Sequence, residues 1–515
     1  MCSYHYSKND SRCSVFGKEV FSDPTILEIL EKYKQIWSLG YAIALIQWDM
    51  ETNMPPDGIE ERGAANAQLT VLQHRLLLSP ELKTLVQKAK EKDNLTEQEK
   101  GIVRVLSREI EREEKLPERL IAELKEVTTK AHEAWLISRE RKEAEPFLGY
   151  LDRIVALERE MAEKIGYKEH PYDALMDYFE EGFTTKKAKE MFDTIIPALK
   201  QSLEYVLSNE TFPRCHYLES YRYDVERAKK VNEKILEMMD FPKKRGRLDV
   251  SAHPFTINIG HRDVRITTRY EGFDIRRTIL STIHEFGHAL YELQVDDALS
   301  MTPIGTGVSM GVHESQSRFW ENIIGRSRAF SKVIGAMLRE EFPELRAYDD
   351  EEIYRYVNLV RPSFIRVDAD ELTYNFHIAL RFEIERQLIA GEIKTSDVPE
   401  LWNNMMEDLL GIKPRNYAEG FLQDIHWSQG SIGYFPSYSL GTVLAAQIKA
   451  KMESEVGSLS EIIEKKELGV IRGWLKEKIH KYGATYSPME LLQRSLGESL
   501  NPEYYVKYIR EKYSK

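Results

Sequence analysis

The chain has 515 residues, of which 42% are hydrophobic and 30% are charged, as in a globular protein with a large core. Its formal net charge is −12. Because an acidic chain repels nucleic-acid phosphates, the composition argues against a nucleic-acid partner. No stretch approaches the roughly 20 apolar residues that span a bilayer, so we expect no membrane partner either.

The cysteines and the N-terminus bear on the cellular compartment. Cys2, Cys13 and Cys215 are scattered and form no CxxC pair. This usage fits a reducing compartment and indicates neither a disulfide framework nor a thiolate zinc site. The first residues also lack the continuous apolar run of a signal peptide. We therefore expect a cytoplasmic protein.

The first predicted elements are a tail, a helix and a loop. Residues 1–23 read as an N-terminal extension, and a segment with helical spacing of apolar residues begins after Pro24. Residues 49–58 read as a loop, because Pro55 and Pro56 block the continuation of a helix.

Most of the remaining chain has a helical pattern. Nearly every segment of residues 60–165 is predicted to be helical, and two further helices are expected over residues 184–206 and 223–239. The abundant Glu, Lys and Arg of these segments are read as solvated helix faces with i,i+4 pairs.

One short stretch has the alternation of β-strands. Residues 255–259 and 264–269 are predicted as two antiparallel strands around a turn at residues 260–263. Helices then resume, interrupted by a Gly- and Tyr-rich loop at residues 430–441. We find no internal repeat and no linker. The prediction is a mainly α protein, with one large helical body over residues 24–515 and a small antiparallel β element.

The helix expected after the strands contains His284, Glu285 and His288 in the spacing HExxH. Residues four apart lie on the same face of a helix, so both imidazoles can converge on one metal ion. Glu285 is rotated by about 100° from His284 and can act on a water instead. The alternative is a pair of histidines on a helix surface.

The third metal ligand is sought by spacing. Tyr291 and Gln294 stand where a metzincin needs Gly and His, and Gly307 stands where the common aminopeptidase spacing places Glu. The next acidic residue in a helical context is Glu314, after a Gly-rich connection that would let a second helix return beside the first. Two histidines and one glutamate leave an open coordination position, as in catalytic zinc sites. The neighbouring His313 is assigned a supporting or structural role.

Several motifs accompany HEFGH in a fixed order. They are WDMETNMPP near residue 48, HPF at 253–255, DVRIT at 263–267, HEFGH at 284–288, HES at 313–315, IRVDAD at 365–370 and GFLQDIHW at 420–427. Together they resemble the signature set of the Taq-type thermostable carboxypeptidases, the M32 metallopeptidases, from about Pro24 to the C-terminus.

The resemblance implies a nearly all-helical fold with a deep substrate groove, the metal at its floor and commonly a homodimer. It implies release of single residues from peptide C-termini, with broad side-chain tolerance and with Pro disfavoured. One divalent ion per chain is implied, with zinc as the first choice and cobalt as an ion that also supports activity.

Catalytic roles are assigned within this resemblance. Glu285 is the expected general base, which takes a proton from water and later passes it to the leaving amine. A neutral donor for the oxyanion is expected on the glycine-rich loop or beside it, and His426, Tyr434 and Tyr438 are the candidates. The alternative for each tyrosine is packing in the core or at an interface.

An exopeptidase also needs a cation for the free carboxylate of its substrate. Arg366 is the first candidate and Arg265 the second, because guanidinium groups bind carboxylates through two parallel hydrogen bonds. The alternatives are ion pairs with Asp370 and Asp263 in the same motifs. His253 is either a substrate contact or a loop-packing residue.

Two expectations concern the substrate and the activity. The strand at residues 264–269 is expected to offer an edge to which an extended peptide pairs. The nearest alternative enzyme is an oligopeptidase or dipeptidyl carboxypeptidase with the same HExxH-to-Glu layout. From a different class, the alternative is a metal-stabilised peptide-binding protein without turnover.

Overall fold

Side chains at the helix starts explain why the first helices begin where they do. In front of α1 (Pro24–Thr52), Asp23 accepts hydrogen bonds from two backbone N–H groups of the first turn. In front of α4 (Glu97–Lys115), Thr96 and Glu99 form a reciprocal capping box. Both helices then bury one apolar face, as the spacing of their apolar residues predicts.

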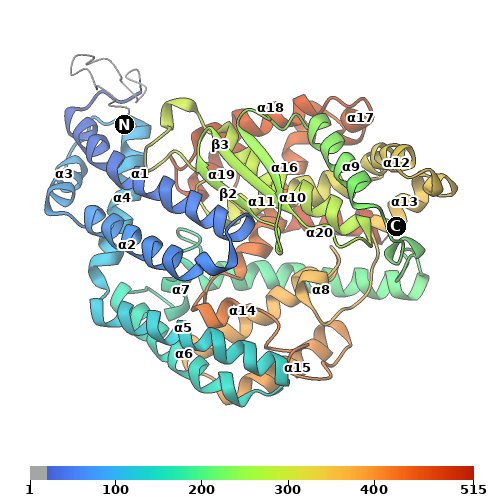
Figure 1. The fold of residues 1–515 in the computed structure, drawn as a ribbon, viewed down its shortest axis with the longest axis horizontal. Coiled ribbons are helices and arrows are strands. Elements are labelled where there is room, and N and C mark those ends of the chain that lie inside the picture. Colours follow the sequence, from blue (N-terminus) through green and yellow to red (C-terminus); the bar gives the residue numbers. More distant parts are fainter. Residues whose placement is uncertain (1–19, 515) are drawn as a thin grey trace.

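The computed structural model describes residues 20–514, which form a mostly helical body around one small sheet (Figure 1). The helices of the N-terminal part are α1, α2 (Ile59–Leu77), α3 (Pro80–Lys90), α4, α5 (Glu118–Arg141), α6 (Glu145–Ile165), α7 (Pro171–Met176) and α8 (Thr185–Asn209).

The later helices begin with α9 and extend to the C-terminus, and α10 among them packs against the sheet. They are α9 (Val225–Met238), α10 (Ile275–Gln294), α11 (Met310–Arg318), α12 (Arg328–Glu341), α13 (Asp350–Val357), α14 (Tyr374–Ala390), α15 (Val398–Leu410), α16 (Pro436–Val456), α17 (Leu459–Glu464), α18 (Leu468–Lys478), α19 (Pro488–Leu496) and α20 (Glu503–Tyr513).

Short helical turns join the longer elements. The π-helical turn η4 (Phe319–Gly325) continues α11. The 3₁₀ turns are η1 (Pro56–Gly58), η2 (Tyr217–Glu219), η3 (Asp297–Leu299), η5 (Pro343–Ala347), η6 (Arg366–Asp368), η7 (Thr395–Asp397), η8 (His426–Gln429) and η9 (His480–Tyr482). Within residues 20–514, no helix is both long and apolar enough to cross a membrane.

The mainly helical prediction is confirmed, with corrections near the N-terminus. The loop expected at residues 49–58 is shorter, because α1 continues to Thr52 and η1 begins at Pro56. Buried Trp48 anchors the last turns of α1, and a proline is tolerated in the first turn of a helix. Residues 1–19 of the expected extension lie outside the described part. Phe21 is buried and belongs to the folded body.

The sheet has three strands in the order β1–β3–β2, namely β1 (Gly246–Val250), β2 (Thr256–Gly260) and β3 (Asp263–Thr268). The pairing of β2 with β3 is antiparallel, as predicted, but β1 pairs with β3 in parallel. The predicted antiparallel pair is confirmed, and the sheet contains a third, parallel strand that the sequence did not predict. The strand β1 was missed because its side chains are half exposed and lack a buried alternation.

The position of β3 in the sheet contradicts the expected substrate edge. Strands β1 and β2 occupy both hydrogen-bonding edges of β3, so no peptide can add to it. One face of β3 presents Val264 and Ile266, which are fully buried, and α10 packs beside this strand. The sheet thus supports the helix that carries HExxH.

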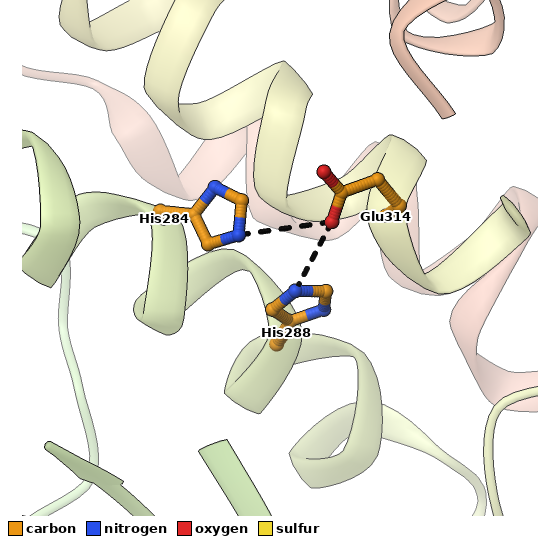
Figure 2. A group of neighbouring side chains, drawn as sticks. All are labelled: His284, His288 and Glu314. Carbon is orange, nitrogen blue, oxygen red and sulfur yellow. Dashed lines mark ion pairs between the residues drawn. The ribbon is translucent and has the colours of Figure 1, made fainter. Parts of the chain in front are cut away.

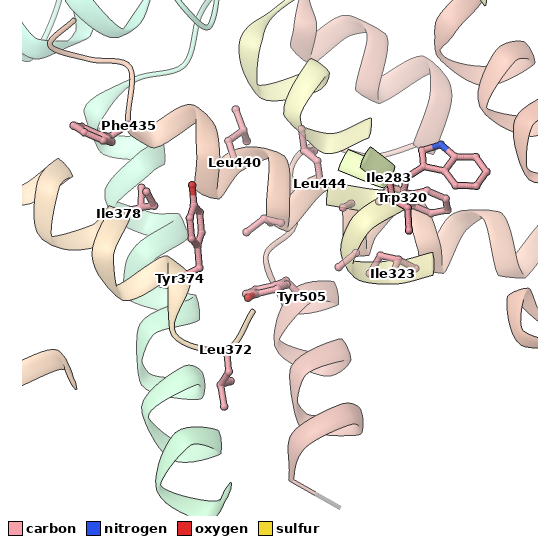
Figure 3. Packing of buried hydrophobic residues seen from close by; sticks show 14 of the residues in the cluster. Ile283, Trp320, Ile323, Leu372, Tyr374, Ile378, Phe435, Leu440, Leu444 and Tyr505 are labelled. Atoms are coloured by element: carbon pink, nitrogen blue, oxygen red, sulfur yellow. The ribbon is translucent and has the colours of Figure 1, made fainter. Parts of the chain in front are cut away.

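Helices α10, α11, α14, α16 and α20 build the centre of the core. Figure 3 shows apolar side chains of α10, α14, α16 and α20 packed together, among them Ile283, Tyr374, Ile378, Leu440, Leu444 and Tyr505. The glycine-rich loop ends earlier than predicted, because α16 begins at Pro436 and includes Tyr438 and Gly441. A proline at the first position of a helix has the backbone angle that the helix needs.

Candidate metal and catalytic site

Three side chains from two helices converge at the centre of the molecule. Helix α10 contributes His284 and His288, and α11 contributes Glu314, as Figure 2 shows. The Glu314 Oε2 atom lies 3.7 Å from His284 Nε2 and 3.4 Å from His288 Nε2. One ligand atom from each residue lies within 4.8 Å of the others. Zinc bonds of about 2.0–2.2 Å in a tetrahedron place ligand atoms roughly 3.3 Å apart, so the three residues fit such an ion.

The far nitrogen of each imidazole is also engaged. The Nδ1 atom of His284 lies 2.9 Å from Glu321 Oε2. The Nδ1 atom of His288 lies 2.8 Å from His313 Nδ1, and His313 Nε2 lies 2.7 Å from Glu292 Oε1. A histidine that gives Nε2 to a metal donates its Nδ1–H to an acceptor. Both histidines are therefore oriented with Nε2 toward Glu314.

The second oxygen of Glu314 is held by an arginine. Arg318 Nε donates to Glu314 Oε1 at 2.6 Å, and Arg318 also pairs with Glu321 at 3.2 Å. Burial opposes ionisation, but the charges of Arg318 and His284 hold the pKa of Glu314 well below its usual range. Glu314 is thus an ionised carboxylate whose Oε2 atom faces both histidines and also accepts a hydrogen bond of 3.0 Å from Ser317 Oγ.

Two glycines let the helices approach closely enough for this geometry. A Cβ atom at Gly287 would lie 2.6 Å from the backbone oxygen of Gln316, so α10 and α11 cross at that point. A Cβ atom at Gly441 would lie 2.6 Å from the Cβ and Cγ atoms of Glu314, which brings α16 against α11. Gly287, the glycine within HEFGH, is therefore needed for the close contact between α10 and α11.

Glu285 lies beside the three converging residues and faces the sheet. Its Oε2 atom accepts a hydrogen bond of 2.6 Å from Thr256 Oγ1 on β2. Burial raises the pKa of Glu285 above its ordinary value. A carboxyl group with a raised pKa is suited to take up a proton and return it during a reaction.

The three candidates for the oxyanion donor form one cluster. His426 Nε2 lies 3.4 Å from Tyr438 Oη, and the rings of Tyr434 and Tyr438 meet edge to face at 5.1 Å. Burial raises the pKa of Tyr434 to about 12 and lowers the pKa of His426 to about 4. All three groups are therefore neutral near pH 7. Only Tyr434 lies on the loop, since His426 belongs to η8 and Tyr438 to α16.

Arg366 is nearly buried and is joined to this cluster. Its Nε and Nη2 atoms donate to Asp424 Oδ1 at 2.9 and 2.8 Å, and its Nη1 atom donates to Tyr374 Oη at 3.1 Å. Asp424 is shared with Arg381, so two guanidinium groups face one carboxylate. The alternative prediction, an ion pair between Arg366 and Asp370, is wrong, because Arg366 pairs with Asp424.

Arg265 and His253 lie in different surroundings. Arg265 forms two hydrogen bonds of 2.7 Å with Asp263 and stacks over the ring of Trp48 at 4.3 Å. The structure thus shows the ion pair with Asp263 that was the alternative to a substrate-binding role for Arg265. The side chain of His253 is exposed between β1 and β2, and its backbone carbonyl accepts a hydrogen bond from Ser251. Neither residue is brought to the converging histidines by a described contact.

Several residues around the site were not found from the sequence. Glu321 lies seven residues after Glu314 on the continuation of α11, and that spacing could have found it. Asp424 belongs to the motif that includes His426, so the motif pointed to it. Thr256 and Arg381 act through contacts with distant parts of the chain, for which no local signal exists.

A helical body in which an HExxH helix and a glutamate of a second helix converge defines the class of metal-dependent peptidases. The family model described as carboxypeptidase Taq (M32) metallopeptidase matches residues 28–513. The chain is 51% identical over 497 residues to thermostable carboxypeptidase 1 of Pyrococcus furiosus, covering 96% of this chain and 100% of that relative. It is 38% identical to carboxypeptidase 1 of Bacillus subtilis, covering 95% of this chain and 97% of the relative.

The three-dimensional comparison agrees. The solved structure of the Pyrococcus furiosus carboxypeptidase matches with a TM-score of 0.95 at 51% identity, covering 96% of this chain and 100% of that one. The chain therefore belongs to the M32 family of metallopeptidases, the carboxypeptidase Taq family, and is a metal-dependent carboxypeptidase. The recognition made from the ordered motifs is confirmed.

Proposed function

We propose that this enzyme releases single amino acids from the free C-termini of peptides, with broad side-chain tolerance and with Pro disfavoured. The observation that carries this proposal is the convergence of His284 Nε2, His288 Nε2 and Glu314 Oε2 beside the carboxyl group of Glu285. The proposed ion is zinc, which cobalt can replace, and the proposed assembly is a cytoplasmic homodimer with a deep substrate groove.

The metal and the base have separate roles in this proposal. A divalent ion held by His284, His288 and Glu314 would supply Lewis-acid activation of the attacking water. Glu285 takes the proton of that water, and its hydrogen bond with Thr256 fixes the direction of the carboxyl group. Its raised pKa lets it return the proton to the leaving amine.

The tyrosine cluster supplies the donors for the developing oxyanion. Tyr434 and Tyr438 keep their protons because burial raises the pKa of both hydroxyls. A neutral hydroxyl can donate to an oxyanion without a competing charge. The ring of His426 packs at a tilt against the rings of Tyr434 and Phe435 and is neutral near pH 7, so it also orients the cluster.

Arg366 is the proposed anchor for the substrate carboxylate. Asp424 is the one carboxylate within 4.0 Å of Arg366 in the described part of the chain, and Arg381 shares it. The positive charge at Arg366 is thus only partly compensated, and a substrate carboxylate would complete the compensation. Arg265 is fully engaged by Asp263 and remains the second candidate, while His253 remains a candidate substrate contact.

The deciding experiment compares a blocked dipeptide with its C-terminal amide, using protein whose metal content has been measured. The carboxypeptidase proposal expects rapid hydrolysis of the free acid and little hydrolysis of the amide. Equal cleavage of both would favour the oligopeptidase reading instead. Glu285→Gln should keep the metal and lose about 10²–10⁴-fold in kcat. A metal-loaded wild-type protein without turnover would favour the peptide-binding alternative.

A further inference from the structure

A second buried carboxyl group, outside the metal centre, holds the segment from Trp427 to Gly433, which leads to Tyr434. Glu385 on α14 is 0% exposed. Its Oε2 atom accepts hydrogen bonds from Tyr172 Oη at 2.5 Å and from the Gly433 N–H at 2.9 Å, and its Oε1 atom accepts one from Trp427 Nε1 at 2.7 Å. The three donors come from α7, from the loop and from η8.

Two of these donors bracket the chain that leads to Tyr434. Trp427 lies in η8 at the start of this segment, and Gly433 is the residue directly before Tyr434. Gly433 has a φ of +98°, which favours glycine. A Cβ atom there would lie 2.8 Å from the backbone carbon of Leu175 at the end of α7. Glu385 and α7 therefore fix the backbone at Gly433 from two sides.

The position of Gly433 sets the position of the neighbouring phenol. The ring of Tyr434 is held edge-on by Phe179 at 5.1 Å and by Tyr438 at 5.1 Å. The backbone carbonyl of Phe179 also accepts a hydrogen bond of 3.1 Å from the Met310 N–H at the start of α11. A movement of the backbone at residue 433 would thus displace Tyr434 relative to the helix that carries Glu314.

We propose that Glu385 is a positioning residue that places the Tyr434 hydroxyl for catalysis by anchoring Gly433 and Trp427. The inference rests on the proposed oxyanion role of Tyr434. Replacing the carboxyl group by an amide places an NH₂ group at one of the two oxygen positions that face these donors. At least one buried N–H or O–H of the anchor then loses its partner. The segment then shifts, while the metal ligands keep their own contacts.

The test is a double-mutant cycle with Glu385→Gln and Tyr434→Phe, measured on the metal-loaded full chain with a blocked dipeptide. Glu385→Gln should lower kcat about 10-fold, with KM and bound metal unchanged. If Glu385 acts through Tyr434, the double variant should be no more than about 2-fold slower than Tyr434→Phe alone. Multiplicative losses would overturn the proposal and leave the role of Tyr434 intact.

Two further variants keep the test decisive. Trp427→Phe removes one donor without altering the buried carboxylate, and should show the same non-additivity with a smaller loss if Glu385→Gln fails to fold. Glu158→Gln is the control for the loss of a buried carboxyl group. Glu158 is buried beside Gly430 and interacts with Glu385 through its charge, but within residues 20–514 it accepts no hydrogen bond from residues 427–433. Its kcat should stay within about 2-fold of wild type.

Other outcomes also decide the question. A Glu385→Gln protein with normal kcat and a lower Tm would show a structural role only and would overturn the proposal. A Tyr434→Phe protein with full activity would remove the proposed role of Tyr434 and the positioning role together. The failure of the positioning role alone is therefore recognised by a slow Tyr434→Phe variant with additive effects.

Discussion

At the scale of single residues, the imidazoles of the site are held by carboxylates on the side away from Glu314. Glu321 accepts from His284 directly, and Glu292 is reached from His288 through His313. Glu321 is also bound by Arg318 and Arg326 at 3.2 and 2.9 Å, so its position is determined from three sides. Such partners fix the tautomer and the orientation of a ligand.

Glu321→Gln should therefore weaken metal binding before it affects folding. The amide cannot hold His284 as a carboxylate does, and its NH₂ group conflicts with the donors of Arg318 or Arg326. We expect a loss of about 10–100-fold in metal affinity, measured by competition with a chelator. Glu344→Gln, at an exposed carboxylate that accepts from Tyr221, is the control. An unchanged metal affinity in Glu321→Gln would show that Glu321 does not support the ligand.

The two candidate carboxylate anchors make opposite predictions for substrate binding. In Arg366→Lys the fork that binds Asp424 and Tyr374, and that is proposed to bind the substrate carboxylate, is lost. The kcat/KM for the free-acid peptide should therefore fall about 10–100-fold. Arg265→Lys should stay within about 2-fold, because Asp263 and Trp48 already occupy that guanidinium group. Steady-state kinetics with the free acid measure both. The reverse ranking would transfer the anchor role to Arg265.

At the scale of elements, the site depends on how closely α10, α11 and α16 approach one another. Gly441→Ala would place a methyl group 2.6 Å from the side chain of Glu314, so α16 or Glu314 must move. We expect a loss of about 1–3 kcal/mol in the free energy of unfolding, together with weaker metal binding. Urea unfolding and chelator competition measure the two effects.

The matched control is Gly473→Ala in the interior of α18. A Cβ atom there meets nothing within 4 Å, and alanine favours a helix over glycine by about 0.5–1 kcal/mol. This variant should be equal to wild type or more stable, with unchanged metal affinity. Equal behaviour of the two variants would mean that the contact between α16 and Glu314 tolerates an added methyl group.

The elements that were predictable from sequence are those with a local periodic signal. The helices within residues 60–165 and the pair β2 and β3 have that signal, and so does α10 with its HExxH spacing. Strand β1 was not predictable, because its parallel partner β3 lies across a connection that carries no pairing signal. The early start of α16 was masked by the glycines and tyrosines before it.

In the site, too, the residues that share one local element were predictable, and the contacts between distant parts of the chain were not. His284, Glu285 and His288 share one helix, so their spacing alone brings them together. Glu314 needed a second helix to return, which spacing suggested and the family resemblance supported. The pairing of Arg366 with Asp424 joins residues 58 positions apart, so it is a property of the folded chain.

At the scale of the whole molecule, the core buries carboxyl groups whose pKa values are raised. Burial raises the pKa of Glu158 to about 8 and those of Glu180 and Glu385 to about 7, from an ordinary value of 4.5. A group with a raised pKa stays protonated in the folded state at a pH where the unfolded chain has released the proton. The free energy of unfolding that these groups contribute is therefore lost as the pH rises through their folded pKa values.

Buried histidines act in the opposite direction over a lower pH range. Burial lowers the pKa of His288 and of His426 to about 4, below the ordinary value of 6.5. Between these values the unfolded chain binds more protons, so the stability from these groups rises with pH. The two effects oppose each other up to about pH 6.5, and the carboxyl groups dominate from there to about pH 8.

Glu158→Gln removes the largest of these pKa shifts, because the amide has no charge at any pH. Burial and the charge of Glu385 together raise the pKa of Glu158, and Glu385 remains in the variant. Relative to wild type, the variant should gain free energy of unfolding as the pH rises from about 5 to about 8, by up to about 1.4 kcal/mol for each pH unit. Above that range the difference should become constant. Urea unfolding of both metal-loaded proteins from pH 5 to 9 measures it, and a constant offset from the missing carboxyl group does not affect the slope. A difference independent of pH would mean that Glu158 ionises in the folded protein as it does in water, and that the helices around it admit solvent.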